Sequence, residues 1–229
     1  MRLLVNADDL GLSEPVNDAI LDALARGWCT GTSLLATGPA FADAVKRVGA
    51  PVGVHLDLTE FEPLTPAMRR VTGGRFTPEH RHLRDAAVVL EEWEAQVARV
   101  RAAGLTVDHL DAHQHVHHGQ LAVLRALCER TGVRRVRGMA SWRVASWPRR
   151  ARQALRAAAF RTRLRAAGLR TPDHFASLEV WLALRPRAVG IVELMVHPGN
   201  PAHTRYAEEL RALAEGRLGD APRVGWDAV

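Results

Sequence analysis

The chain has 229 residues, of which 47% are hydrophobic and 24% are charged. This composition is close to the globular average and excludes wholesale disorder. A chain of this length can form one α/β barrel or one open α/β sheet, so we expect a single domain over residues 1–229. The formal net charge is +6, and two carboxylates interrupt the start of the chain before any apolar run reaches the length of a signal peptide or a membrane span. We therefore expect a cytoplasmic protein without stable membrane insertion.

Short apolar runs alternate with helical patterns along the whole chain, which is typical of repeated βα units and a mainly parallel sheet. Ser13 is the expected N-cap of the first helix and Gly27 its end. The segment 59–78 is rich in proline and glycine and is expected to be a loop over the site. Strands are expected at residues 3–7, 32–36, 52–58, 107–111, 133–136, near 173–175 and at 191–196, with helices over 14–26, 41–48, 84–103, 121–130, the arginine-rich region after residue 136, and 206–214.

About seven strands with helices between them favour an incomplete or distorted (β/α) barrel over a doubly wound sheet. No GxGxxG or GxxxxGK[ST] loop follows any of these strands. The sequence therefore argues against a nucleotide-binding fold.

The positive charge is concentrated in residues 134–170, which contain no Asp or Glu. Such a stretch can bind nucleic acid or anionic lipid, and it can also be a solvated helix face. Its arginines are Arg134, Arg135, Arg137, Arg143, Arg149, Arg150, Arg152, Arg156, Arg161, Arg163, Arg165 and Arg170. The two cysteines, Cys29 and Cys128, are too few for a disulfide framework and lack CxxC spacing, so we expect both to be reduced and buried.

Polar residues gather at the ends of the expected strands, where parallel α/β folds place their reactive groups. Asp8 and Asp9 end the first strand, and only a turn, which Gly11 makes plausible, could aim both carboxylates at one centre. His55 lies in the third strand, and His197 follows the late strand. The alternative for the aspartates is capping of a helix or loop, and the alternative for His55 is an ordinary hydrogen-bonded histidine in a strand.

Five of the eleven histidines lie between His109 and His118. In this stretch Asp111, His113, His115 and His117 alternate and so share one side of the chain. Imidazole binds borderline divalent ions well, and two imidazoles with one carboxylate leave an open coordination position. The pattern therefore predicts a catalytic metal site rather than a closed structural one.

Four segments of the sequence resemble the YdjC-like carbohydrate deacetylase family, which includes chitooligosaccharide and hopanoid-associated deacetylases. They span nearly the whole chain in the order expected for that family. The segments are Asn6-Ala7-Asp8-Asp9-Leu10-Gly11-Leu12-Ser13, Gly53-Val54-His55-Leu56-Asp57-Leu58, His109-Leu110-Asp111-Ala112-His113-Gln114-His115-Val116-His117, and Glu193-Leu194-Met195-Val196-His197-Pro198-Gly199.

The resemblance implies a polysaccharide-deacetylase-like barrel that removes acetyl groups from N-acetylated sugars. It aligns Asp9, His55 and His113 with the metal ligands, Asp8 with the catalytic base and His197 with the catalytic acid. Further residues are expected to orient the ligands or contact the sugar. These are Asp111, His115, His117, Glu193, and Arg135 or Arg137, either of which would orient Asp8.

The implied cofactor is one divalent metal ion, and the two histidines favour zinc, although the carboxylate would also accept magnesium. The expected partner is an N-acetylated sugar, with a homodimer as the default assembly. Two alternatives stay open: a metal-dependent phosphoesterase, and a non-catalytic basic protein that binds nucleic acid. No recognition helix or aromatic stacking motif accompanies the arginines, so we expect no nucleic-acid partner.

Overall fold

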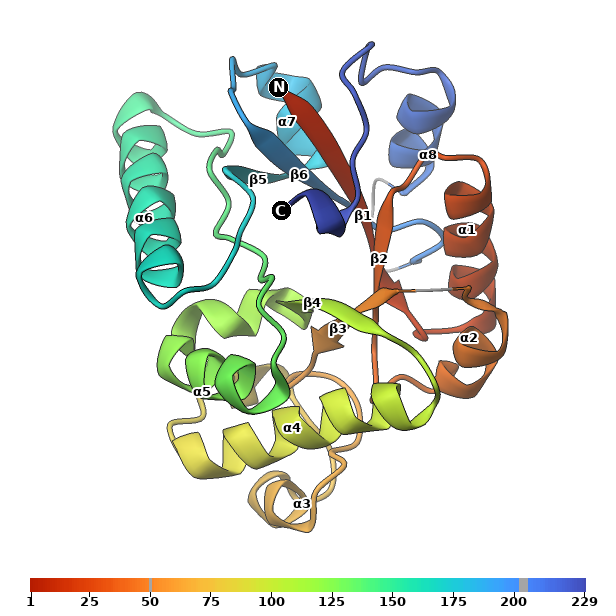
Figure 1. Ribbon diagram of the computed structural model, residues 1–229, viewed down its shortest axis with the longest axis vertical. Helices are drawn as coiled ribbons and strands as arrows, with labels where there is room; N and C mark the ends of the chain where they lie inside the picture. The colour runs from red at the N-terminus through yellow and green to blue at the C-terminus, as the bar shows by residue number, and fades with distance from the viewer. Residues whose placement is uncertain (50, 202–205) are drawn as a thin grey trace. The chain divides into compact units, whose positions relative to one another are not determined.

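The structure is a computed structural model that describes residues 1–49, 51–201 and 206–229 (Figure 1). Its strands are β1 (Arg2–Leu10), β2 (Gly31–Leu34), β3 (Val52–Leu56), β4 (Val107–Ala112), β5 (His174–Ser177) and β6 (Ile191–Val196). Its α-helices are α1 (Glu14–Ala25), α2 (Phe41–Arg47), α3 (Pro66–Thr72), α4 (Ala86–Ala102), α5 (Leu121–Thr131), α6 (Trp147–Ala166), α7 (Leu178–Leu184) and α8 (Tyr206–Ala214). Three 3-10 helices complete the fold: η1 (Pro78–His82), η2 (His113–Gly119) and η3 (Trp226–Ala228).

The strands form a six-stranded sheet in the order β4-β3-β2-β1-β6-β5. Strand β1 pairs in parallel with β6, so that Ala7 lies opposite Val196, and β5, β3 and β4 join their neighbours in parallel as well. Parallel pairing brings the carboxyl ends of neighbouring strands to one edge of the sheet. The architecture confirms the predicted parallel α/β fold of the distorted barrel type.

The chain divides into two compact units. Unit 1 comprises residues 1–8, 18–32 and 135–229, and unit 2 comprises residues 9–17 and 33–134. The boundary falls inside β1, between Asp8 and Asp9.

In unit 1 the last residues of the chain pack against β1. Leu4, Ile191 and Trp226 form a buried apolar cluster, and Val224 and Val229 pack against it. In unit 2, α4 packs on β3 and lies beside α5, with Trp93 fully buried (Figure 1). Each unit thus has its own apolar packing.

The prediction of a loop over residues 59–78 is wrong in part, because α3 occupies its centre. Thr65 is the N-cap of α3 and its hydroxyl accepts a hydrogen bond from the backbone N–H of Met68. Pro66 stands at the first helical turn, and Gly73 ends the helix in the left-handed conformation with φ 69°. The proline and glycine that suggested a loop are the boundaries of a short helix.

The strand predicted at residues 133–136 is wrong as well. Arg135 makes only an isolated parallel bridge with Arg170. Among the described residues the sheet therefore has six strands instead of about seven. The other predicted strands and helices agree with the structure to within a few residues at their ends.

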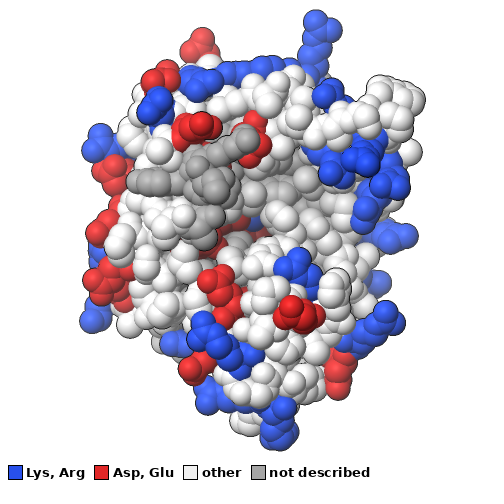
Figure 2. Space-filling view, turned by 180° about the vertical axis from the view of Figure 1, so that it is seen from behind, with Lys and Arg blue, Asp and Glu red and all other residues white. Residues whose placement is uncertain are grey.

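The arginine-rich region forms α6, a helix of 20 residues. Figure 2 shows Lys and Arg side chains gathered along the edge where α6 lies, at the right of this view from behind. No helix within the described part of the chain combines the length and apolar character needed to cross a bilayer. Cys29 and Cys128 are both free and buried, and burial raises the pKa of each thiol to about 12.

Candidate metal centre and active site

A turn at the end of β1 sets the position of Asp9. Its φ is 70°, in the left-handed region that residues other than glycine rarely adopt, and Gly11 follows with φ 92°. The backbone N–H of Leu12 donates to the Asp9 carbonyl at 3.0 Å, and that of Gly11 donates to the Asn17 side chain at 2.7 Å. The turn that was expected near Gly11 is therefore present at the end of β1.

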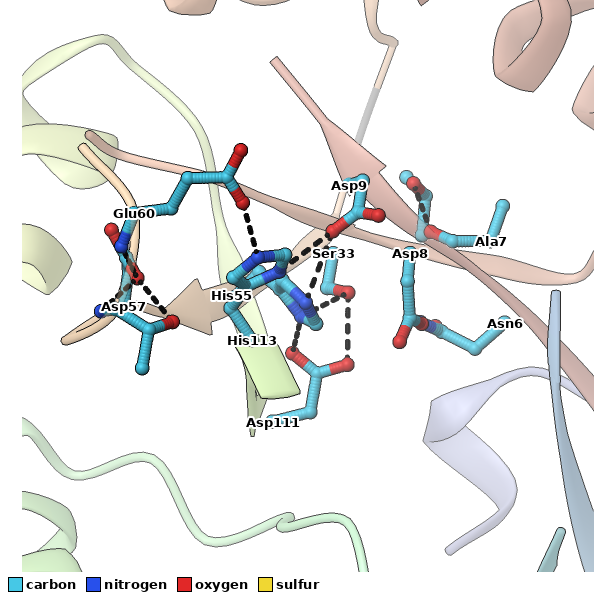
Figure 3. Close-up of polar contacts among 12 residues, drawn as sticks. Asn6, Ala7, Asp8, Asp9, Ser33, His55, Asp57, Glu60, Asp111 and His113 are labelled. Atoms are coloured by element: carbon cyan, nitrogen blue, oxygen red, sulfur yellow. Dashed lines mark hydrogen bonds and ion pairs between the residues drawn. The ribbon is translucent and has the colours of Figure 1, made fainter. Parts of the chain in front are cut away.

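Asp9, His55 and His113 converge in unit 2 (Figure 3). The Asp9 Oδ1 atom lies 3.3 Å from His55 Nε2 and 3.1 Å from His113 Nδ1. Each of the three residues offers one ligand atom, and these atoms lie within 4.8 Å of one another. His55 comes from β3, and His113 is the first residue after β4.

The second nitrogen of each histidine meets a further carboxylate. His55 Nδ1 lies 2.8 Å from Asp111 Oδ1, and His113 Nε2 lies 2.8 Å from Glu60 Oε2. The Ser33 hydroxyl donates to the other Asp111 oxygen at 2.8 Å. Such outer carboxylates fix the ring orientation and raise the basicity of metal-bound histidines.

Burial and charge compete in this cluster. Burial alone would raise the pKa of Asp9, but hydrogen bonds and charge from His113 and His55 outweigh it and hold that pKa well below its ordinary value. Burial alone would lower the pKa of His113, but Asp9 and Glu60 raise it to about 9. The carboxylate of Asp9 is therefore kept ionised.

These contacts fit a divalent metal ion. One ionised carboxylate and two imidazoles bring their ligand atoms close together. The other ring nitrogen of each imidazole contacts a second carboxylate, that of Asp111 or Glu60. Three protein ligands with room for a further ligand are the pattern of a catalytic site. The structure therefore contains a potential metal-binding site at Asp9, His55 and His113.

The loop after β3 positions Glu60. The buried Asp57 carboxylate accepts hydrogen bonds from the backbone N–H groups of Thr59, Glu60 and Phe61. The side-chain amide of Gln96 on α4 accepts a hydrogen bond from the backbone N–H of Asp57 and donates one to the backbone carbonyl of Asp57. The turn that carries Glu60 is thus tied to α4, and its side chain remains partly exposed.

Asp8 is held in unit 1 by a buried arginine. Arg137 makes a bidentate ion pair with it, Nη1 to Oδ2 at 2.6 Å and Nη2 to Oδ1 at 2.7 Å. The Nε of Arg137 donates to Glu193, and its guanidinium lies 4.9 Å from the ring centre of Phe175. Asn6 donates a further hydrogen bond to Asp8 at 2.9 Å.

Of the two arginines predicted to orient Asp8, Arg137 is the one in contact with it. The guanidinium of Arg135 instead lies at the backbone carbonyl of Val229, 3.4 Å away. Glu193, predicted near the site, joins Asp8 through Arg137. Asn6 is in turn fixed by Trp226, whose indole N–H donates to it at 3.0 Å.

His197 follows β6 in unit 1 and contacts Glu209 of α8. The backbone N–H of His197 donates to Glu209 Oε2 at 2.9 Å, and its Nδ1 lies 4.0 Å from the same oxygen. Burial raises the pKa of Glu209 to about 7. Glu209 is therefore a buried acid that lies against the predicted proton donor.

The remaining histidines of the cluster pack on one another in η2. His115 stacks with His118 at 5.4 Å between ring centres, and the rings of His117 and His118 are 4.3 Å apart. The alternation predicted from Asp111 to His117 is wrong beyond Ala112, because β4 ends there and Gln114 and His115 have positive φ angles of 49° and 57°. Asp111, which does lie in β4, is the member that reaches His55.

Ser33, Glu60 and Glu209 were not predicted as site residues. Each lies at or after a strand end or on a helix that follows, and none belongs to a recognisable spacing pattern. Glu60 alone had a usable signal, because it comes shortly after Asp57 in the loop that leaves the strand of His55.

Comparisons with known proteins find a matching family model and curated relatives. A family model described as YdjC-like protein matches residues 2–221. A carbohydrate deacetylase of Halalkalibacterium halodurans is 40% identical over 129 residues, which cover 51% of this chain and 54% of that protein. A carbohydrate deacetylase of Oceanobacillus iheyensis is 33% identical over 127 residues, covering 51% of this chain and 55% of that protein. The chain thus matches about half the length of these curated relatives.

A solved structure from Enterococcus faecalis V583, described as that of a cellobiose-phosphate cleavage protein, has the same fold. Its TM-score is 0.75 at 23% sequence identity, and the match covers 99% of this chain and 98% of that one. At this identity the likeness supports the fold alone.

Proposed function

Because the chain belongs to the YdjC-like protein family, we propose that it is a metal-dependent hydrolase that removes the acetyl group from an N-acetylated sugar. The products are acetate and a free amino sugar. The observation that carries the proposal is the convergence of Asp9, His55 and His113, with Asp111 and Glu60 behind the two histidines. The names of the curated relatives support the acetylated sugar as the substrate class.

We propose that Asp9, His55 and His113 hold one zinc ion. Imidazole nitrogens suit zinc, whereas magnesium prefers an all-oxygen octahedral shell. When bound, the ion supplies Lewis acidity for the acetamide carbonyl and for the attacking water. Metal analysis of the purified protein tests this assignment, and magnesium in place of zinc at one equivalent would overturn it.

In this mechanism Asp8 takes a proton from the water that attacks the acetamide carbon. Arg137 and Asn6 hold the carboxylate of Asp8 in one orientation, so the base does not rotate away from the water. Because Asp8 directly precedes Asp9 in the chain, the backbone links the base to a metal ligand.

His197 protonates the amine nitrogen as the C–N bond breaks, which allows the amino sugar to leave. Its backbone N–H donates to Glu209, and this contact fixes the turn that carries the imidazole. We propose that residues 1–229 work as one deacetylase domain, because the family model matches residues 2–221 and so covers parts of both units.

The decisive experiment is acetate release from a panel of N-acetylated mono- and oligosaccharides, with metal-loaded and chelator-treated protein. We expect release from at least one sugar, its loss with the chelator and its return when zinc is added back. If no member of the panel releases acetate and phosphate monoesters are hydrolysed instead, the phosphoesterase alternative replaces the deacetylase.

A further inference from the structure

Helix α6 has one buried face and one exposed face. Its buried residues are Ala157, Phe160 and Leu164, all in the C-terminal half of the helix. With 3.6 residues per turn these three share one side, and Leu155 lies nearly opposite to them. No residue in the N-terminal half of α6 is buried.

Large apolar side chains are exposed on this half of the helix and just before it. The exposed fraction is 79% for Trp147, 71% for Leu155 and 57% for Val144, which lies just before the helix. Three of the six large hydrophobic side chains that are exposed among the described residues thus fall within twelve positions. A single exposed apolar residue needs no explanation, but a local group of them indicates a surface that contacts something apolar.

Arginines lie on both sides of this apolar strip. On the helical projection Arg152, Arg156 and Arg163 lie beyond Leu155 on one side of the strip, and Arg161 lies beyond Trp147 on the other. Arg165 lies in line with Trp147, about five turns further along the helix. Arg161 and Arg165 also bond Asp173, at 2.7 and 2.8 Å, which ties that side of the helix to its unit. Arg152, Arg156 and Arg163 are exposed and carry long side chains that can reach outward.

An apolar strip with tryptophan and leucine, bordered by arginines and without any acid, is typical of a helix that lies in the interface of a membrane. Arginine binds lipid phosphate in a bidentate manner, and tryptophan favours the headgroup level. Nucleic acid would match the arginines, but it gives no role to exposed leucine and valine. The charge and the apolar strip together favour a lipid surface.

We propose that α6 and the preceding residue Val144 form a docking surface for a bilayer of anionic phospholipid, on which the protein sits peripherally. This inference goes beyond the proposed hydrolase activity and does not depend on it. Trp147, Leu155 and Val144 enter the interfacial layer, and Arg152, Arg156 and Arg163 contact the headgroup phosphates.

The test is cosedimentation of the full chain with vesicles of phosphatidylcholine alone and of phosphatidylcholine mixed with phosphatidylglycerol. We expect binding only to the mixed vesicles, and weaker binding as salt is raised. The triple variant Arg152→Glu, Arg156→Glu, Arg163→Glu should lower vesicle affinity by about 100-fold, because each of the three arginines near the surface contributes about fivefold. A matched control, Arg70→Glu, Arg75→Glu, Arg125→Glu, has the same net charge and should retain most of the affinity.

The apolar part is tested separately with Trp147→Ser, Leu155→Ser, against the control Val71→Ser, Val189→Ser, which removes exposed side chains elsewhere. Vesicles of brominated lipid should quench tryptophan fluorescence in the wild type and much less in Trp147→Phe. All these positions are exposed, so circular dichroism should show unchanged folding. Equal binding to neutral vesicles, unchanged binding of both test variants, or binding only to an oligonucleotide duplex would overturn the proposal.

Discussion

Arg135 and Arg137 lie two residues apart and have different surroundings. Arg137 is fully buried between two carboxylates, whereas Arg135 reaches the backbone at Val229. The sequence predicted that one of the pair would orient Asp8 but could not choose between them. The choice depends on an ion pair between residues 129 positions apart, which no local spacing encodes.

We predict that Arg137→Lys lowers kcat about 100-fold and leaves KM nearly unchanged. Lysine cannot form the bidentate contact, so Asp8 loses its fixed orientation, and a displacement of about 1 Å can cost this much. Arg135→Lys is the matched control and should retain wild-type kinetics. Steady-state assays with thermal melts of both variants check the prediction, and an equal loss in the two variants would argue against a positioning role.

Substitution of the proposed base should separate proton transfer from metal binding. Asp8→Asn should reduce turnover by about 100-fold or more while one equivalent of metal stays bound. His113→Ala should release the metal, because it removes one of three ligands. Elemental analysis beside acetate release distinguishes the two, and near-normal activity of Asp8→Asn would refute the assignment of the base.

Helix α3 shows what a local pattern leaves undecided. The prolines and glycines of residues 59–78 were compatible with a loop and with a capped short helix. The structure selects the helix because the buried Glu92 of α4 accepts hydrogen bonds from the backbone N–H groups of Leu64 and Thr65 and from the Thr65 hydroxyl. Elements with a long periodic pattern, such as α4 and α5, were predictable without such partners.

We therefore predict that Glu92→Ala destabilises the protein by about 3 kcal/mol, since it leaves several buried donors without an acceptor. Glu91→Ala, at the exposed neighbouring position, should change the free energy of unfolding by less than about 0.5 kcal/mol. Urea unfolding of both variants measures the difference. Similar losses in the two would mean that Glu92 does not hold the start of α3.

At the scale of the whole molecule, the predicted fold agreed with the structure because hydrophobic periodicity and strand order are written along the chain. The long-range contacts within unit 1 do not follow from these local patterns. The hydrogen bond from Trp226 to Asn6 joins residues 220 positions apart, and the bridge between Leu3 and Arg223 joins the two ends of unit 1. Such contacts depend on packing in three dimensions, and the sequence offered no signal for them.

Global stability should depend on pH through Glu209, whose pKa is raised by burial to about 7 from an ordinary value of 4.5. Below pH 4.5 both the folded and the unfolded chain carry this proton, so the group costs no stability there. As pH rises towards 7 the unfolded chain releases the proton while the folded chain keeps it, and stability falls by on the order of 2–3 kcal/mol.

Glu209→Gln should therefore unfold with a free energy that declines less than that of the wild type between these two pH values. Glu208→Gln, at the exposed neighbouring position, should follow the wild type. Urea titrations at several pH values provide the comparison, and parallel curves for Glu209→Gln and the wild type would rule out this contribution.

The burial of Cys29 and Cys128 makes the protein a convenient host for site-directed labelling. With pKa values of about 12 both thiols stay protonated near neutral pH, and neither side chain is open to reagents. A cysteine placed at an exposed position, such as Leu155→Cys, would then be the one reactive thiol of the folded chain. A spin label or fluorophore attached there could report the depth at which α6 meets a bilayer, without prior removal of the native cysteines.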